Sequence, residues 1–181
     1  MIQRNLQIGI IGPSKINYPA NDVLANRLES IAEETGRLIG SAGAILFTGG
    51  ADGVMEASSR GARYSEGIVV ATPGSRRLSS NEYVDVEVLT PINVGDFLFA
   101  GILSSDSLIV IGESAGTTAE LALGYRHKKP TIIIRGFSDY YDSLINRYMD
   151  RKNCVKFLGA DSPEKAVRLA IEEAEKYFRE G

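Results

Sequence analysis

The sequence predicts a three-layer α/β fold, a doubly wound and mostly parallel sheet of about seven strands with helices on both faces. Seven short runs rich in β-branched residues recur along the chain, and most are too continuously apolar for a strand with one face in water. Helical patterns lie between most of these runs, which is the alternation of βαβ units. The right-handed crossover that joins parallel strands then gives a Rossmann-like sheet.

The strands and helices are expected as follows. The apolar runs place strands within residues 6–12, 44–50, 67–74, 84–90, 107–113, 130–136 and 154–159. The helical patterns cover residues 21–43, 53–67, 94–105, 117–129, 139–150 and 162–180. Gly43 marks the end of the first helix, whereas Ser162 and Pro163 supply an N-cap and a first helical residue for the last.

Length and composition predict one compact domain over residues 1–181, because 181 residues with 44% hydrophobic content can bury a sizeable core. A formal net charge of −3 gives no broad attraction to nucleic acid or to an anionic membrane surface, so neither partner is expected. One cysteine and one histidine provide no cluster of zinc ligands, and no protein-ligated metal is expected. With no secretory or membrane-spanning pattern, the predicted location is the cytoplasm.

Ligands of doubly wound sheets bind beyond the carboxyl ends of the strands, near the switch in strand order. The loop "GIIGPSKIN", residues 9–17, follows the first expected strand. Gly12 permits close approach of the backbone, and Ser14 and Lys15 offer a hydroxyl, N–H groups and a cation to an anion. The loop matches neither GxGxxG nor the P-loop, so a plain strand-to-helix turn remains an equal alternative.

The stretch "LFTGGADGVMEASSRGA", residues 46–62, follows the second strand. Thr48, Gly49 and Gly50 form a turn, Asp52 is placed to cap the next helix, and Gly53 begins "GVMEA". This arrangement directs unpaired N–H groups and the positive end of a helix dipole toward the ligand edge of the sheet. The alternative is purely structural: the glycines adopt positive φ angles and allow tight helix-to-sheet packing.

A third loop, within residues 111–130, follows the strand "SLIVI". Thr117 and Glu120 have the T-x-x-E spacing of a capping box. Gly116, Thr117 and Thr118 would make a second anion-binding helix N-terminus, and Glu120 would act as an acid, a base or an acceptor for a ribose hydroxyl. The two interpretations are compatible, since a capping glutamate can also accept a hydrogen bond from a ligand.

Together, "GGADGVMEA" and "GESAGTTAE" resemble the two signature motifs of the LOG-like Rossmann superfamily, GGGxxGVMEA and PGGxGTxxE. The wording "GVMEA" and the chain length look most like its branch of molybdenum-cofactor carrier proteins. The resemblance implies a homodimer or higher homo-oligomer that holds a nucleotide or another phosphorylated ligand. Carried over onto this sequence, the residues that it implies at the phosphate site are Gly49, Gly50, Gly53, Gly116, Thr117 and Thr118, with Glu120 as the motif's glutamate.

Two departures from the motifs favour binding over catalysis. In catalytic members of the superfamily, which release ribose 5-phosphate from cytokinin nucleotides or purine monophosphates, the glutamate works with an arginine on the preceding helix. Residues 91–106 of this chain contain neither Arg nor Lys, so that orienting charge is missing. "GES" also replaces "PGG", which puts the Glu113 carboxylate beside a phosphate site unless this side chain points away.

The sequence therefore predicts a protein that binds a nucleotide-containing or phosphorylated small molecule, such as a nucleotide or the molybdenum cofactor, at the GGADG and AGTTAE loops. The alternative is a nucleoside-monophosphate phosphoribohydrolase in which Glu120 is catalytic and the missing arginine comes from elsewhere, such as Arg76 or another subunit. The third hypothesis is a scaffold or sensing subunit whose pocket is empty.

Overall fold

The computed structural model describes residues 4–91 and 100–180, apart from the side chains of residues 177–180. Seven strands form one sheet in the order β4-β3-β2-β1-β5-β6-β7, and every neighbouring pair is parallel. The strands are β1 (Gln7–Ile11), β2 (Ile45–Thr48), β3 (Val69–Ala71), β4 (Val86–Glu87), β5 (Ser107–Val110), β6 (Thr131–Ile134) and β7 (Leu158–Ala160). The predicted fold class is confirmed.

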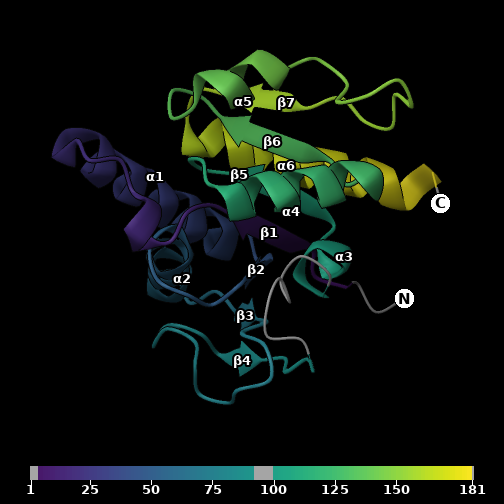
Figure 1. The fold of residues 1–181 in the computed structure, drawn as a ribbon. Helices are drawn as coiled ribbons and strands as arrows, with labels where there is room; N and C mark the ends of the chain where they lie inside the picture. Colours follow the sequence, from purple (N-terminus) through teal and green to yellow (C-terminus); the bar gives the residue numbers. More distant parts are fainter. Residues whose placement is uncertain (1–3, 92–99, 181) are drawn as a thin grey trace.

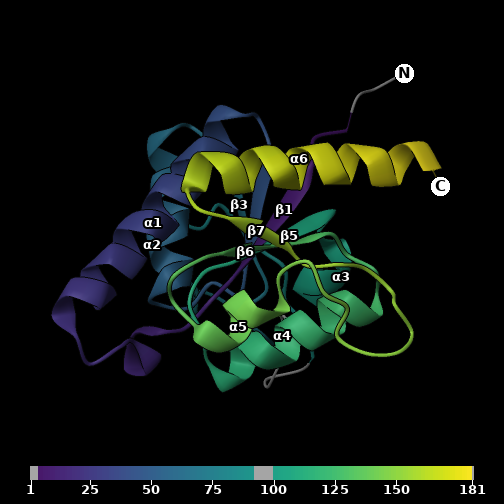
Figure 2. The same cartoon turned by 90° about the horizontal axis from the view of Figure 1, so that it is seen from above.

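Helices cover both faces of the sheet, as Figure 2 shows from above. On one face lie α1 (Asp22–Ser41), α2 (Val54–Tyr64) and α6 (Pro163–Glu180). On the other lie α3 (Ile102–Ser104), α4 (Ala115–Arg126) and α5 (Asp139–Leu144), and a short 3-10 helix, η1 (Lys15–Asn17), follows β1. Two hydrophobic clusters fill the layers, because alternate strand residues such as Ile10 and Ile11 point to opposite faces.

The helix ends agree with the sequence at several points. Asn21 caps α1, its side chain accepting from the N–H of Leu24 at 3.1 Å, and Gly43 beyond the helix has a φ of 70°. Ser162 accepts from the N–H of Lys165 at the start of α6. α1 and α2 pack with their backbones in contact, since a Cβ on Gly36 would lie 1.9 Å from the carbonyl oxygen of Ser58.

Several expected elements differ in extent. The strand expected over residues 84–90 is only Val86–Glu87, an edge strand with Val86 and Val88 partly exposed. The helix expected over 139–150 ends at Leu144, because Ile145 is extended and Asn146 has a φ of 63°. Of the helix expected over 94–105, residues 94–99 lie outside the described part of the chain, and α3 covers Ile102–Ser104.

The strand order reverses beside β1. The chain runs from β1 outward through β2, β3 and β4, then returns to the other side of β1 to form β5, β6 and β7 (Figure 1). The loops that follow β1, β2 and β5 therefore leave the carboxyl edge of three adjacent strands. This is the position at which doubly wound sheets bind ligands.

Candidate ligand-binding site

The loop after β1 lies between the other two predicted loops. Gly12 is buried, and a Cβ there would lie 2.4 Å from the carbonyl oxygen of Ile111 and 2.6 Å from Val54 Cγ1. Gly12 therefore allows β1, the end of β5 and the start of α2 to meet. Ser14 is half-buried and extended, and its Oγ lies 3.3 Å from the donating Nδ2 of Asn17.

Lys15 joins this loop to the GGADG loop through its backbone. Its N–H donates to Asp52 Oδ1 at 3.0 Å, and its exposed ammonium lies 3.8 Å from the Glu56 carboxylate on α2. The expectation that Asp52 caps α2 is wrong: Gly53 occupies the N-cap position and no side chain caps the helix. With Gly53 at a φ of 71°, the chain turns so that the Asp52 carboxylate reaches across to Lys15 instead.

The first turn of α2 is covered by the loop after β1. Gly53 is buried, and a Cβ on it would lie 2.6 Å from the carbonyl oxygen of Pro13 and 2.8 Å from the N atom of Lys15. The N–H of Val54 donates to the same Pro13 carbonyl at 3.1 Å. The first N–H of α2 is thus used inside the protein rather than presented to a ligand.

The turn that precedes α2 is held from the side of β3. Gly50 is buried, and its carbonyl oxygen accepts from both the backbone N–H of Asn81 at 2.7 Å and the Asn81 Nδ2 at 3.1 Å. Gly49 is half-buried. Thr48 is fully buried, and within residues 4–91 and 100–180 its hydroxyl has no hydrogen-bond partner.

The N-terminus of α4 is built differently from the capping box expected there. Ser114, not Thr117, is the N-cap, and its Oγ accepts from the N–H of Thr117 at 3.1 Å. Thr117 is buried in the first turn, its hydroxyl 2.8 Å from Ser114 Oγ, and Glu120 lies one turn further on. The helix begins earlier than expected because the extended backbone of Ser114 (φ −165°, ψ 171°) already provides a cap.

This first turn of α4 is open. Ala115 and Gly116 are exposed, and their N–H groups have no hydrogen-bond partner among the described residues. A Cβ on Gly116 would approach only Ser114 Oγ, at 3.7 Å. Free N–H groups at the positive end of a helix dipole favour an anion.

Thr118 and Glu113 join α4 to the segment after β6. Thr118 Oγ1 lies 2.8 Å from the hydroxyl of Tyr141, a buried residue of α5. The Glu113 carboxylate accepts from the hydroxyl of Ser138, the N-cap of α5, so Glu113 is directed toward α5. A cavity of about 340 Å³ opens beside these contacts, lined by Asn17, Glu113, Ser114, Thr118, Tyr140 and Tyr141.

Glu120 is half-buried on α4, and burial raises the pKa of its carboxyl to about 8. No hydrogen bond or ion pair to this carboxyl is present within the described ranges. Since its pKa lies above neutral pH, Glu120 is mostly protonated at pH 7. Residues 91–106 contain no basic residue that would restore its charge.

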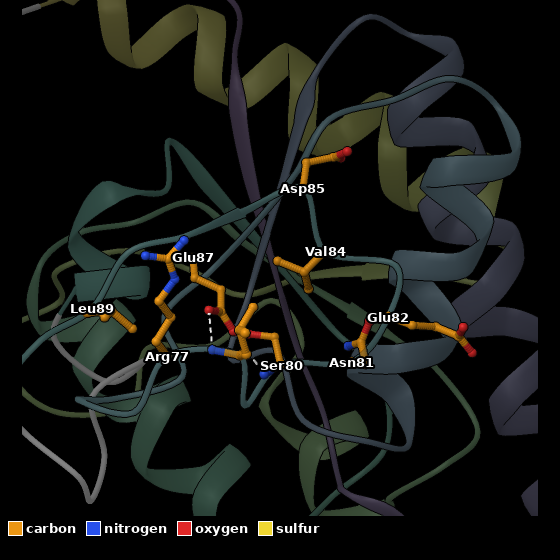
Figure 3. A pocket seen from close by; sticks show the side chains of 9 residues that line it. Arg77, Ser80, Asn81, Glu82, Val84, Asp85, Glu87 and Leu89 are labelled. Atoms are coloured by element: carbon orange, nitrogen blue, oxygen red, sulfur yellow. Dashed lines mark hydrogen bonds between the residues drawn. The ribbon is translucent and has the colours of Figure 1, made fainter.

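A larger cavity, about 610 Å³, lies at the β3–β4 edge (Figure 3), and its lining residue Asn81 is the one that bonds to Gly50 of the predicted site. Arg77 lies there together with Glu82, Asp85 and Glu87. The Glu87 carboxylate accepts from the backbone N–H groups of Leu78, Ser79 and Ser80 at 2.7–3.1 Å. These hydrogen bonds lower its pKa and fix the loop from which Asn81 reaches Gly50.

Comparisons with known proteins identify the family of the chain. Residues 5–167 match the model of the SLOG cluster4 family. The chain belongs to this family. An uncharacterized family relative from Archaeoglobus fulgidus is 31% identical over 137 residues, which cover 72% of this chain and 85% of the relative.

Solved structures of molybdenum cofactor carrier proteins are similar over nearly the whole chain. The molybdenum cofactor binding protein of Rippkaea orientalis is 29% identical, with a TM-score of 0.79 and coverage of 93% of this chain and 97% of that one. The carrier protein of Chlamydomonas reinhardtii is 26% identical, with a TM-score of 0.76 and coverage of 96% and 99%. The structure of TM1055 is 29% identical, with a TM-score of 0.81 and coverage of 92% and 99%. This chain thus lies in the molybdenum-cofactor-carrier-like branch of the LOG-like superfamily.

No described helix is both long and apolar enough to cross a membrane. Within the same residues, no group of three or more His, Cys, Asp and Glu side chains is placed to hold a metal ion.

Residues that the sequence did not single out take part in the site. Tyr141 and Ser138 follow β6, and Asn81 follows β3, so each is far along the chain from the residue that it contacts. The sequence did contain one signal for the start of α5: Ser138 is a serine, a preferred N-cap residue, directly before a short helical pattern.

Proposed function

We propose that this protein binds a phosphorylated small molecule at the first turn of α4 and holds it without transforming it. One observation carries the proposal: the exposed N–H groups of Ala115 and Gly116 have no partner within residues 4–91 and 100–180. They lie beside the switch in strand order, at the positive end of a twelve-residue helix. A phosphate oxygen there would accept from the backbone without displacing an existing contact.

The molybdenum cofactor is the first candidate ligand, and a nucleotide is the second. The cofactor carries a phosphate, and two of the similar structures are those of a molybdenum cofactor binding protein and a molybdenum cofactor carrier protein. The Ser14 hydroxyl and the Lys15 ammonium, both from the neighbouring loop, would add a donor and a positive charge. Residues 48–53 would support the site indirectly, by packing against that loop at Gly53.

The phosphoribohydrolase alternative is less well supported by the site. A glutamate that stabilises an oxocarbenium-like transition state acts in its ionised form. Burial raises the pKa of Glu120 to about 8 and therefore opposes that form at neutral pH. Release of ribose 5-phosphate from adenosine and guanosine monophosphate, measured with a Glu120→Ala control, tests this alternative directly. Turnover that depends on Glu120 would contradict the binding-only proposal.

The phosphate site is tested by removing one N–H without disturbing the helix. Ala115→Pro does this, because proline is favoured at the first helical position and the preceding Ser114 is extended, as a residue before proline prefers. The protein is purified from cells that make the molybdenum cofactor, and bound molybdenum and released pterin are quantified. We expect wild-type protein to retain both and Ala115→Pro to retain about tenfold less, since a hydrogen bond to a charged group contributes about 1.5–3 kcal/mol.

The matched control is Asp22→Pro, which places proline at the first position of α1 behind another extended N-cap, Asn21. It should fold and bind like the wild type. Absence of molybdenum and pterin from the wild-type protein would contradict the cofactor as ligand. Equal binding by Ala115→Pro and wild type would contradict the proposed phosphate position.

The homodimer or higher homo-oligomer implied by the resemblance stays a prediction. Light scattering during gel filtration gives the mass in solution, which is compared with 19.6 kDa for one chain. A single peak at that mass over the working concentration range would contradict it.

A further inference from the structure

The cavity between η1, α4 and α5 adjoins the proposed phosphate position. It is about 340 Å³ in volume and is lined from three loops, those after β1, β5 and β6. Ser114 belongs to this lining and is also the N-cap of α4, so the cavity lies next to the open N–H groups of Ala115 and Gly116. A ligand with its phosphate at Ala115 and Gly116 could place its next group here.

Glu113 presents an oriented carboxylate to this cavity. The Ser138 hydroxyl donates its proton to Glu113 Oε2 and at the same time accepts from the N–H of Tyr141 at 3.2 Å. This chain of hydrogen bonds fixes the carboxylate as an acceptor. Its second oxygen, Oε1, has no hydrogen-bond partner in the described part of the chain.

Tyr140 gives the cavity an aromatic wall. The residue is 57% exposed although the neighbouring Tyr141 is buried, and the two ring centroids are 5.7 Å apart with a 50° angle between the planes. An exposed aromatic face beside a cavity is suited to stacking on a flat heterocycle. Asn17, on the η1 side, contributes an amide that can donate to a ring carbonyl.

We propose that this cavity binds the heterocycle of the ligand, and that it selects rings with a 2-amino-4-oxopyrimidine edge, as found in pterins and guanine. Such an edge carries a ring N–H and an amino N–H side by side, and the two donors match the two oxygens of one carboxylate. Adenine presents a donor beside an acceptor and does not match. Tyr140 stacks on the ring while Glu113 accepts from its edge. This inference rests on the proposed function, because the phosphate at α4 anchors the ligand.

Matched ligand pairs test the selectivity. Guanosine and inosine monophosphate share a phosphate and differ by the 2-amino group. Pterin and lumazine carry no phosphate, differ by an amino group in place of an oxo group, and therefore test the heterocycle cavity without the anchor. We expect wild-type protein to favour the amino member at least tenfold in at least one pair, by calorimetry for the nucleotides and by fluorescence for the pteridines. The pair that shows the preference distinguishes a guanine ligand from a pterin ligand.

Variants assign the preference to its residues. Glu113→Gln keeps the size and an acceptor for Ser138 but places an amide where an acceptor is needed, so the preference should fall to about equal binding. Tyr140→Ala should weaken both members of the pair about tenfold, and Tyr140→Phe should bind like the wild type. Glu82→Gln, which removes a similar exposed charge at the β3–β4 edge, is the control and should leave the preference unchanged.

The outcomes separate this inference from the proposed function. If neither pair shows a preference in wild-type protein, or if Glu113→Gln leaves the preference intact, the heterocycle assignment is wrong. If the nucleotides then still bind more weakly to Ala115→Pro than to the wild type, the proposed phosphate site is retained. If wild-type protein binds none of the four ligands and also lacks bound cofactor, the proposed function fails and this inference fails with it.

Discussion

The N-termini of α2 and α4 carry similar glycine-rich sequences and lie at the same edge of the sheet, yet among the described residues the first N–H of α2 is bonded within the protein and the first N–H of α4 is not. At α2, Gly53 packs against Pro13 and the first N–H of the helix donates to the Pro13 carbonyl. At α4, Gly116 is exposed and the first N–H groups have no partner within the described ranges. Glycine spacing alone therefore does not separate packing from binding. The atoms that an added Cβ would meet do separate them.

The largest expected effect follows from this contrast. Gly53→Ala forces a side chain into a positive-φ conformation and against backbone atoms of Pro13 and Lys15, at 2.6 and 2.8 Å. We expect it to lower the free energy of unfolding by about 3 kcal/mol. Gly116→Ala meets nothing closer than 3.7 Å and should be neutral or slightly stabilising, since alanine is the better helix former. Urea denaturation measures both, and equal losses would contradict the contrast.

The second effect concerns the charge behind the open turn. Because burial raises the folded-state pKa of Glu120 to about 8, the folded protein binds this proton more tightly than the unfolded chain does. The free energy of unfolding therefore falls as pH rises from about 4.5 toward 8. Below about pH 4.5 this loss is absent. Glu120→Gln should stabilise the protein by about 1–2 kcal/mol at pH 8 and by little at pH 5.

Stability measured across that pH range in both proteins gives the test. The variant should differ from the wild type by an amount that grows with pH. A constant difference from pH 5 to pH 8 would show that Glu120 does not titrate in the window. In that case the argument against an ionised, catalytic Glu120 would be lost.

The fold was predictable because the strands are buried on both faces, which leaves continuous apolar runs such as "TIII" in β6. The caps were less predictable. Ser114 and Thr117 are both good N-cap residues, and the choice between them depends on the backbone angles of Ser114. Asp52 is equally suited to a cap, but its position beside Lys15 depends on how two loops pack.

Side-chain partners across the fold were the least predictable part. Arg60 of α2 is held by Glu33 at 2.8 Å and Glu29 at 3.4 Å across the α1–α2 interface. Tyr141 and Thr118 lie 23 residues apart and meet only because β6 lies beside β5. Local patterns carry no information on such contacts, which follow from the strand order.

A smaller effect tests the cap that opens α4. Ser114→Ala removes the acceptor for the N–H of Thr117 and should cost about 1 kcal/mol in the free energy of unfolding. Thr117→Ala would cost more than Ser114→Ala if Thr117 were the cap. Thermal denaturation of the two variants decides between these caps. Because Thr117→Ala also removes a buried methyl group, Thr117→Val, which keeps that bulk, is the cleaner comparison.

The smallest effect concerns the hydrogen bond that joins the loop after β1 to the GGADG loop at the N-terminus of α2. Asp52→Ala removes the acceptor for the Lys15 N–H, an exposed hydrogen bond, and should cost only about 0.5 kcal/mol of stability. Asp52→Asn keeps an oxygen acceptor there and should behave like the wild type. If the GGADG loop supports the site only by positioning residues 13–17, Asp52→Ala should weaken ligand binding slightly, with no change in which ligand is preferred. A loss of binding as large as that of Ala115→Pro would mean that the ligand contacts the GGADG loop itself, and the two helix N-termini would then share one anion.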